Sequence, residues 1–236
     1  MRKQVQIYGD SVMRGVILGE DNRYCFSRGG KIDAFMQEFP VDIQNKSSFG
    51  CTVTKGCQLL EKGLKKQEAS PCDMILVEYG GNDCDFNWEE VAAAPEAEHL
   101  PKTPLSKFEG MMRGAVKAIK DKGITPLLMS LPPIDAERYI GWITKTGLSK
   151  QNIVKWLGDV HMIYRFQELY SNTIGKIARE TGSFFVDVRS YFLDKHNYKH
   201  LFCADGIHPN VDGHELIRVA FGEFMRRNDG LLACGG

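Results

Sequence analysis

Three side chains in this sequence have the types that nucleophilic catalysis requires. Ser11 follows an apolar run near the start of the chain, and Asp205 precedes His208 by three residues in the stretch DGIHPN. A serine hydroxyl is a weak nucleophile that needs a base within hydrogen-bond reach, itself oriented by a third group. Because Gly206 and Pro209 favour a turn over a helix, Asp205 and His208 can meet directly. We predict that Asp205 holds one ring nitrogen of His208 while the other faces Ser11.

Acyl transfer also requires hydrogen-bond donors for the negative oxygen of its tetrahedral intermediate. Asn82 lies in EYGGND after a strand-like run, and its side-chain amide can donate two hydrogen bonds. Gly50 precedes a predicted helix, where a backbone N–H can face an anion, although Gly56 lies nearby. Together with the backbone N–H of Ser11, these donors predict an oxyanion hole made of Ser11, Gly50 and Asn82.

The other histidines fit structural roles better. His214 falls at the start of the last predicted helix, where a capping or packing role is expected. His196 and His200, in DKHNYKH, are expected to be solvated loop residues. His208 is therefore the predicted base.

Short apolar runs alternate with segments of helical periodicity along the chain. The strand-like runs are residues 5–8, 41–45, 74–80, 125–131 and 183–188. The helical segments are residues 31–39, 53–66, 105–122, 160–181 and 211–227. This alternation predicts an α/β fold with a parallel sheet covered on both faces, formed by a single domain over residues 1–236.

Two segments interrupt the alternation directly after predicted strands. Residues 85–103 and 132–159 are predicted loop insertions, the second partly helical, on the side where open α/β sheets bind ligands. They carry Trp88, Trp142 and Trp156, which can line a substrate pocket or form a separate hydrophobic cluster, the commoner arrangement.

Composition narrows the class of protein. The 236 residues contain 30 basic and 30 acidic side chains, so no net charge favours binding to nucleic acid or to an anionic membrane. We expect neither a secretory signal nor a membrane-spanning segment. The seven cysteines form no C-x-x-C pair, which argues against a zinc or redox site and favours free thiols in the cytoplasm. Nothing in the sequence predicts the oligomeric state.

Each of the polar stretches also has a purely structural interpretation. Asp10 and Ser11 are preferred N-cap residues, and GGND and DGIHPN are typical turns. These interpretations do not explain why all three turns fall at the same edge of one predicted sheet.

Four sequence blocks, in order, resemble those of the SGNH hydrolases, also called the GDSL esterase and lipase superfamily. They are GDS at 9–11, Gly50 in SFG, GGND at 80–83 and DGIHPN at 205–210. Val12 stands where that family often has leucine, and valine should pack equally well. The resemblance implies a three-layer α/β/α sandwich with a five-stranded parallel sheet in the flavodoxin-like order 2-1-3-4-5. It also implies Ser11 as nucleophile, His208 as base and Asp205 as its partner.

The sequence therefore predicts a serine hydrolase that cleaves carboxylic esters through an acyl-enzyme, with no cofactor and no metal. Small soluble esters or acetylated carbohydrates are the expected substrates. One alternative is a non-catalytic ligand-binding protein that keeps the fold. Another is a flavodoxin-like nucleotide or flavin binder, although the chain has no G-x-G-x-x-G or Walker motif.

Overall fold

Five parallel strands form the central sheet of the protein, seen here in a computed structural model that describes residues 2–27, 31–65 and 72–232. In spatial order the strands are β4 (Val41–Asn45), β1 (Lys3–Gly9), β5 (Met74–Glu78), β6 (Thr125–Met129) and β7 (Phe184–Val186). Counted along the chain, this order is 2-1-3-4-5. The predicted sheet and its order are confirmed.

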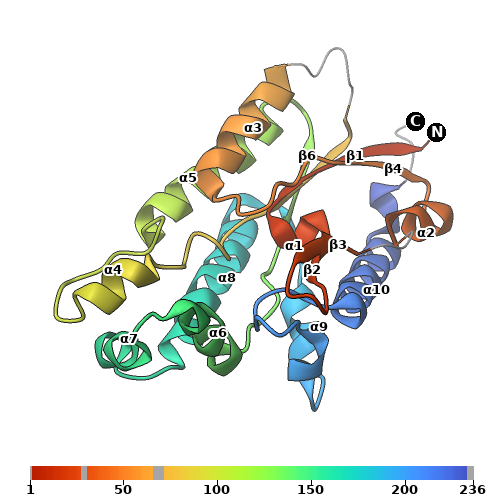
Figure 1. Cartoon of the computed structure of the whole chain (residues 1–236). Helices are drawn as coiled ribbons and strands as arrows, with labels where there is room; N and C mark the ends of the chain where they lie inside the picture. Colours follow the sequence, from red (N-terminus) through yellow and green to blue (C-terminus); the bar gives the residue numbers. More distant parts are fainter. Residues whose placement is uncertain (1, 28–30, 66–71, 233–236) are drawn as a thin grey trace.

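Helices cover both faces of this sheet (Figure 1). One face carries α3 (Val53–Lys65), α5 (Leu105–Lys120) and α8 (Met162–Thr181). The other face carries α2 (Lys31–Glu38), α9 (Val188–Leu193) and α10 (Val211–Arg227). Strand β5 is buried throughout, with Ile75 and Val77 packing into the first core and Met74 and Leu76 into the second. The three-layer sandwich is thus confirmed.

The helix predicted over 211–227 is observed with those bounds as α10, and the other predicted helices differ from the observed ones at one end each. Helix α2 ends at Glu38 because Pro40 disfavours a helical conformation at Phe39. Helix α5 ends at Lys120, before Gly123 turns the chain with a φ of 71°. The predicted helix over 53–66 reaches Lys65, and residue 66 lies outside the described residues.

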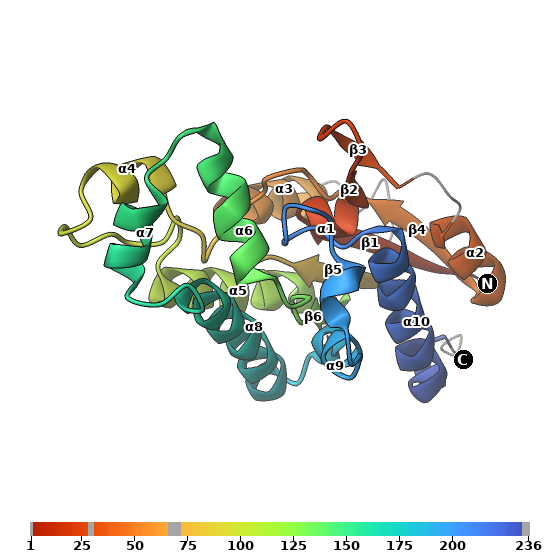
Figure 2. The same ribbon diagram turned by 60° about the horizontal axis from the view of Figure 1, so that its bottom comes forward.

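Both predicted insertions contain helices. Residues 85–103 include α4 (Trp88–Ala93), and residues 132–159 include α6 (Ala136–Ile143) and α7 (Lys150–Leu157). These three helices gather beside one end of the sandwich (Figure 2). They share a separate apolar core, here called the outer cluster, which comprises Phe86, Trp88, Val91, Ala92, Ile134, Ala136, Tyr139, Ile140, Ile153, Leu157 and Ile163.

A short hairpin follows the first strand and its helix. After α1 (Ser11–Arg14), strands β2 (Val16–Leu18) and β3 (Tyr24–Phe26) pair antiparallel. The sequence analysis did not predict this hairpin.

None of the helices in the described part of the chain combines the length and the apolar character that crossing a bilayer demands.

Candidate active site

Ser11 lies at the carboxyl end of β1, as the first residue of α1. Asp10 caps this helix, its Oδ1 accepting a hydrogen bond of 2.8 Å from Val12 N. A Cβ atom at position 9 would lie 2.8 Å from Met13 Cβ and 2.9 Å from Glu78 Oε2, so glycine is needed there. The structural interpretation of Asp10 as an N-cap is therefore correct, and the cap presents Ser11 at the edge of the sheet.

Asp205 and His208 lie in a tight turn before α10. Gly206 has a φ of 76°, and a Cβ there would lie 2.6 Å from the carbonyl oxygen of Asp135. Asp205 Oδ1 accepts hydrogen bonds of 3.1 Å from the backbone N–H groups of both Ile207 and His208. The turn thereby points both functional side chains to the same side.

The three side chains predicted to act together form one hydrogen-bonded chain. His208 Nδ1 lies 2.7 Å from Asp205 Oδ2, and His208 Nε2 lies 2.9 Å from Ser11 Oγ. All three residues are buried. Residues 197 positions apart in the sequence thus meet in one crevice.

Asp205 is poised to remain ionised. Burial by itself raises the pKa of a carboxyl group, but the hydrogen bonds from the His208 ring and from the backbone of His208 and Ile207 outweigh it. The net effect lowers the pKa of Asp205 below its ordinary value. An ionised Asp205 favours the Nδ1–H tautomer of His208, in which Nε2 is a hydrogen-bond acceptor 2.9 Å from Ser11 Oγ.

The three predicted oxyanion donors line the same cavity as Ser11 Oγ. Among the described residues, the backbone N–H groups of Ser11 and Gly50 donate to no protein acceptor. Asn82 Nδ2 donates to Asp10 Oδ2 at 2.9 Å and makes a longer contact of 3.4 Å with the carbonyl oxygen of Cys51. The Asn82 amide therefore makes one short hydrogen bond, to Asp10, and one long and weak one, to Cys51.

Gly56, the neighbouring alternative, belongs to the packing of the sandwich. It lies in α3, where an added Cβ would approach the Tyr79 ring to 2.2 Å. Asp83 of the GGND turn accepts from Val53 N through both carboxylate oxygens and so joins that turn to the start of α3. Burial raises the pKa of Asp83 to about 6.

The cavity in front of Ser11 has a volume of about 330 Å³. Its far wall comes from the outer cluster, including Phe86, Trp88 and Tyr139. Asp85 Oδ1 accepts hydrogen bonds from Trp88 Nε1 and from Tyr139 Oη, at 2.8 and 2.9 Å. The cavity is thus largely apolar, and polar groups of its wall are already paired within the protein.

The three tryptophans take different positions. Trp88 belongs to the outer cluster and also lines the cavity, whereas Trp156 packs against that cluster. Trp142 stands apart, with its ring 6.4 Å from that of Tyr24 and the ammonium group of Lys145 4.1 Å above it. The expected hydrophobic cluster exists, and Trp88 both belongs to it and lines the cavity.

Sequence reasoning missed the aromatic side chains at the mouth of the cavity. The Tyr24 ring lies 5.0 Å from the His208 ring, and Phe49 stacks on His208 at 6.0 Å with an angle of 10° between the rings. Tyr24 and Phe49 are 40% and 50% exposed, so their outer faces are open to a bound molecule. The β-branched and aromatic residues flanking the turn in VILGEDNRYCF were the available signal for the hairpin that carries Tyr24.

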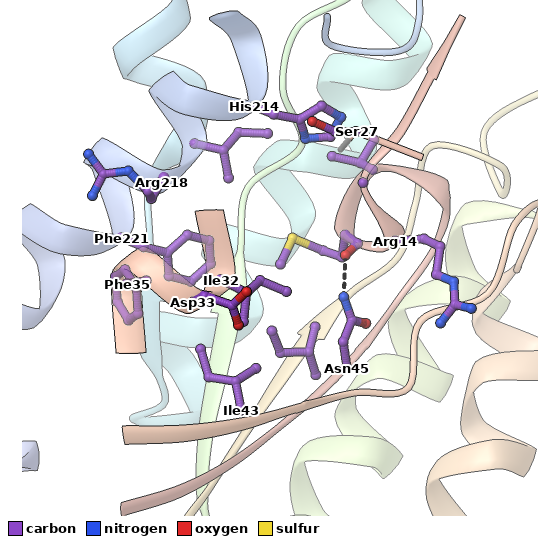
Figure 3. Close-up of a pocket in the computed structure, with 15 residues that line it drawn as sticks. Arg14, Ser27, Ile32, Asp33, Phe35, Ile43, Asn45, His214, Arg218 and Phe221 are labelled. Atoms are coloured by element: carbon purple, nitrogen blue, oxygen red, sulfur yellow. Dashed lines mark hydrogen bonds between the residues drawn. The ribbon is translucent and has the colours of Figure 1, made fainter. Parts of the chain in front are cut away.

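A second cavity, of about 320 Å³, opens among β1, β4, α1, α2 and α10 (Figure 3). His214 lines it, with Nε2 3.1 Å from the carbonyl oxygen of Val16, consistent with the packing role expected for it. Asn45 Nδ2 donates to the carbonyl oxygen of Met13 at 2.7 Å and so ties β4 to α1. This cavity does not include Ser11 or His208.

In the described part of the chain, no group of three or more His, Cys, Asp or Glu side chains is arranged to hold a metal ion. His196 and His200 are exposed, as expected; His196 lies in a turn, whereas His200 lies in a short 3-10 helix, Tyr198–Leu201, and not in a loop.

Comparison with known proteins gives consistent matches. Residues 7–216 match the GDSL-like Lipase/Acylhydrolase family. GDSL esterase/lipase CPRD49 of Arabidopsis thaliana is 23% identical over 231 residues, which cover 95% of this chain and 78% of that protein.

Solved structures show the same fold. The lipase/acylhydrolase from Enterococcus faecalis superposes with a TM-score of 0.64 and 16% identity, covering 100% of both chains. A catalytic mutant of an acetylxylan esterase from Geobacillus stearothermophilus gives a TM-score of 0.63 and 20% identity over 94% of each chain. The chain therefore belongs to the GDSL-like lipase/acylhydrolase family and is a carboxylic ester hydrolase of the SGNH type.

Proposed function

We propose that the protein hydrolyses esters through a triad of Ser11, His208 and Asp205. The observation that carries this proposal is the unbroken hydrogen-bonded chain from Asp205 Oδ2 through the His208 ring to Ser11 Oγ, with distances of 2.7 and 2.9 Å. Nucleophile and base are within hydrogen-bond reach, and the base is oriented by an ionised third group.

In the first half of the reaction, Ser11 Oγ attacks the ester carbonyl carbon while His208 Nε2 takes the hydroxyl proton. The resulting imidazolium is stabilised by Asp205. Collapse of the tetrahedral intermediate breaks the bond to the leaving alcohol, which receives the proton from His208. In the second half, a water molecule attacks the acyl-enzyme, again with His208 as base, and releases the acid and Ser11.

The negative oxygen of each intermediate needs donors that are already in position. The backbone N–H groups of Ser11 and Gly50 and the second amide hydrogen of Asn82 fit this role. The weak contact between Asn82 and the carbonyl oxygen of Cys51 can be exchanged for a bond to the oxyanion, because 3.4 Å is long for a hydrogen bond.

A fluorophosphonate probe tests the triad directly. We expect one adduct on Ser11, detected by mass spectrometry of the intact chain and of its peptides, because the probe phosphonylates an activated serine oxygen with loss of fluoride. His208→Ala should abolish labelling, and His196→Ala, which changes an exposed histidine, should preserve it.

Labelling elsewhere, or at Ser11 without need of His208, would contradict the triad. Absence of labelling in a folded protein would favour the non-catalytic binder instead.

The cavity favours short acyl groups on small alcohols. A volume of about 330 Å³ lies near the lower end of the range for small-molecule sites, about 300–1,000 Å³. Aromatic side chains such as Phe86 and Trp88 line the cavity and limit the space for a long acyl chain. The exposed faces of Tyr24 and Phe49 at the mouth suit the apolar face of a sugar ring, and one structural neighbour is an acetylxylan esterase. We infer that acetyl esters, including those of sugars, are preferred.

A chain-length series of p-nitrophenyl esters, assayed beside acetylated sugars, tests this inference. We expect kcat/KM for the acetate to exceed that for the dodecanoate by about tenfold or more, because the longer chain does not fit. Ser106→Ala, an exposed serine of α5, serves as the control for substitution itself. Equal or higher kcat/KM for the dodecanoate would refute the preference without affecting the triad.

A further inference from the structure

Two neighbouring buried residues with carboxyl groups line the same cavity as Ser11. Asp10 is 2% exposed, and Glu78, the last residue of β5, is 0% exposed. Residues Gly9 and Glu78 pair in the register of β1 and β5, which brings the Glu78 side chain beneath the turn that carries Asp10. The backbone N–H of Asp10 donates to Glu78 Oε2 at 3.2 Å, which makes the two buried carboxyl groups neighbours.

In the part of the chain that the structure describes, no lysine or arginine side chain pairs with either of these two carboxyl groups. The other titratable groups near the pair are Asp83, His208, the buried hydroxyl of Tyr79 and the thiols of Cys51 and Cys84. Burial raises the pKa of both carboxyl groups, and the charge of Asp10 raises that of Glu78 further, so a shared proton on this pair is favoured.

The hydrogen bonds decide which carboxyl holds that proton. Asp10 accepts from Val12 N at 2.8 Å and from Asn82 Nδ2 at 2.9 Å, both of which favour its ionised form. Glu78 accepts from one backbone N–H, and its Oε1 has no partner among the described residues. Burial, followed by the charge of Asp10, raises the pKa of Glu78 well above its ordinary value.

We propose that Glu78 is a positioning residue: its neutral carboxyl group donates to the Asp10 carboxylate, which in turn fixes the Asn82 amide at the oxyanion. This relay rests on the proposed function, since it matters only if Asn82 stabilises the intermediate. Asp10 is the hub, because it caps α1 below Ser11 and holds one amide hydrogen of Asn82. The other amide hydrogen is thereby directed away from Asp10.

Two substitutions of Glu78 distinguish the effect of its hydrogen-bond donor from the effect of its size and shape. Glu78→Gln keeps a donor for Asp10 and removes the titration, whereas Glu78→Leu fills the space and removes the donor. We expect kcat of Glu78→Gln to stay within about threefold of the wild type, and kcat of Glu78→Leu to fall about tenfold or more with little change in KM. Glu89→Gln, at an exposed position of α4, is the control.

A double-mutant cycle with Asn82→Ala tests whether Glu78 acts through Asn82. If it does, Glu78→Leu should lower kcat in the wild-type background and change it less than about twofold in the Asn82→Ala background. Multiplicative effects of the two substitutions would overturn the proposal, because they would show a general structural role.

The pH dependence of thermal stability tests whether Glu78 holds a proton in the folded protein. An acid whose pKa is raised in the folded state gives a stability contribution that is complete below its unfolded pKa and is lost as the pH rises through the folded pKa. We therefore expect the Tm of Glu78→Gln minus that of the wild type to increase from pH 5 to pH 9. A Tm difference that does not change with pH would show that Glu78 is ionised and would overturn the proposal.

The experiments distinguish an error in the role of Glu78 from an error in the proposed catalytic triad. If the wild type is inactive, or if Ser11→Ala retains activity, the proposed function fails. If activity depends on Ser11 while kcat of Glu78→Leu equals that of the wild type, only the role of Glu78 fails. If Glu78→Leu does not fold, the Tm comparison with Glu78→Gln still decides whether Glu78 holds a proton, and loss of kcat in Glu78→Gln would then refute the relay.

Discussion

Replacing Ser11 by alanine is expected to lower kcat for p-nitrophenyl acetate by about four to six orders of magnitude. The substitution removes the Oγ atom that lies 2.9 Å from His208 Nε2, so no acyl-enzyme can form. The fold should persist, because the cap of α1 is made by Asp10 rather than by Ser11. Steady-state kinetics together with circular dichroism and a thermal melt measure both effects.

Ser106→Ala provides the matched control for Ser11→Ala, since Ser106 is exposed on α5 and far in sequence from the site blocks. Its kcat and Tm should equal those of the wild type. Residual turnover of Ser11→Ala above about one part in a thousand would assign the nucleophile to another group.

The second large effect is expected at His208. His208→Ala should lower kcat by about four orders of magnitude or more, because Ser11 then lacks the base that accepts its proton. Removing the ring also leaves the buried carboxylate of Asp205 with backbone donors alone, so we expect a measurable loss of Tm. Kinetics on a short ester and a thermal melt at the same pH report the two effects separately.

His196→Ala and His214→Gln are the controls for His208→Ala. His196 is exposed, and its replacement should change neither kcat nor Tm. His214 lines the second cavity, so its replacement should lower Tm while kcat of the folded enzyme stays close to that of the wild type. A loss of kcat in His214→Gln comparable to that in His208→Ala would require a different assignment of the base.

The sheet could be predicted from the sequence because its strands carry a strong and local signal. Strand β5 is buried on both faces, and its run of apolar residues in MILVE stands out without any tertiary information. The order of the strands and the family, in contrast, came from the four sequence blocks together. The comparisons confirm the family and the fold.

The sequence predicted that Ser11 and His208 lie next to each other in the fold. In the structure, Ser11 Oγ lies 2.9 Å from His208 Nε2. This proximity was predictable because both residues follow elements whose positions in an α/β sheet are constrained.

The mouth of the cavity was not predictable in the same way. Tyr24 lies in β3, which pairs with β2; each strand is three residues long, so the residues of VILGEDNRYCF signal a hairpin without a clear alternation pattern that would place Tyr24 in the cavity. Phe49 lies in the loop after β4, and its contact with His208 depends on the packing of segments distant in sequence. Such contacts leave no periodic trace in a single sequence.

Glu78 was also overlooked, for a physical reason. In the sequence it is one acidic residue at the end of an apolar strand, a position where a solvated side chain is common. Its burial and its contact with Asp10 follow from the register in which Gly9 pairs with Glu78. The register is a property of two strands, and neither strand specifies it alone.

The outer cluster has a consequence for how this enzyme can diversify. It shares no buried residue with the cores on the two faces of the sheet, yet Phe86, Trp88 and Tyr139 of this cluster line the cavity that contains Ser11. Substitutions far enough apart not to touch tend to have independent energetic effects. Natural selection can therefore rebuild substrate preference in this module while the scaffold that aligns the nucleophile keeps its stability, which makes the wall of the pocket the evolvable part of the molecule.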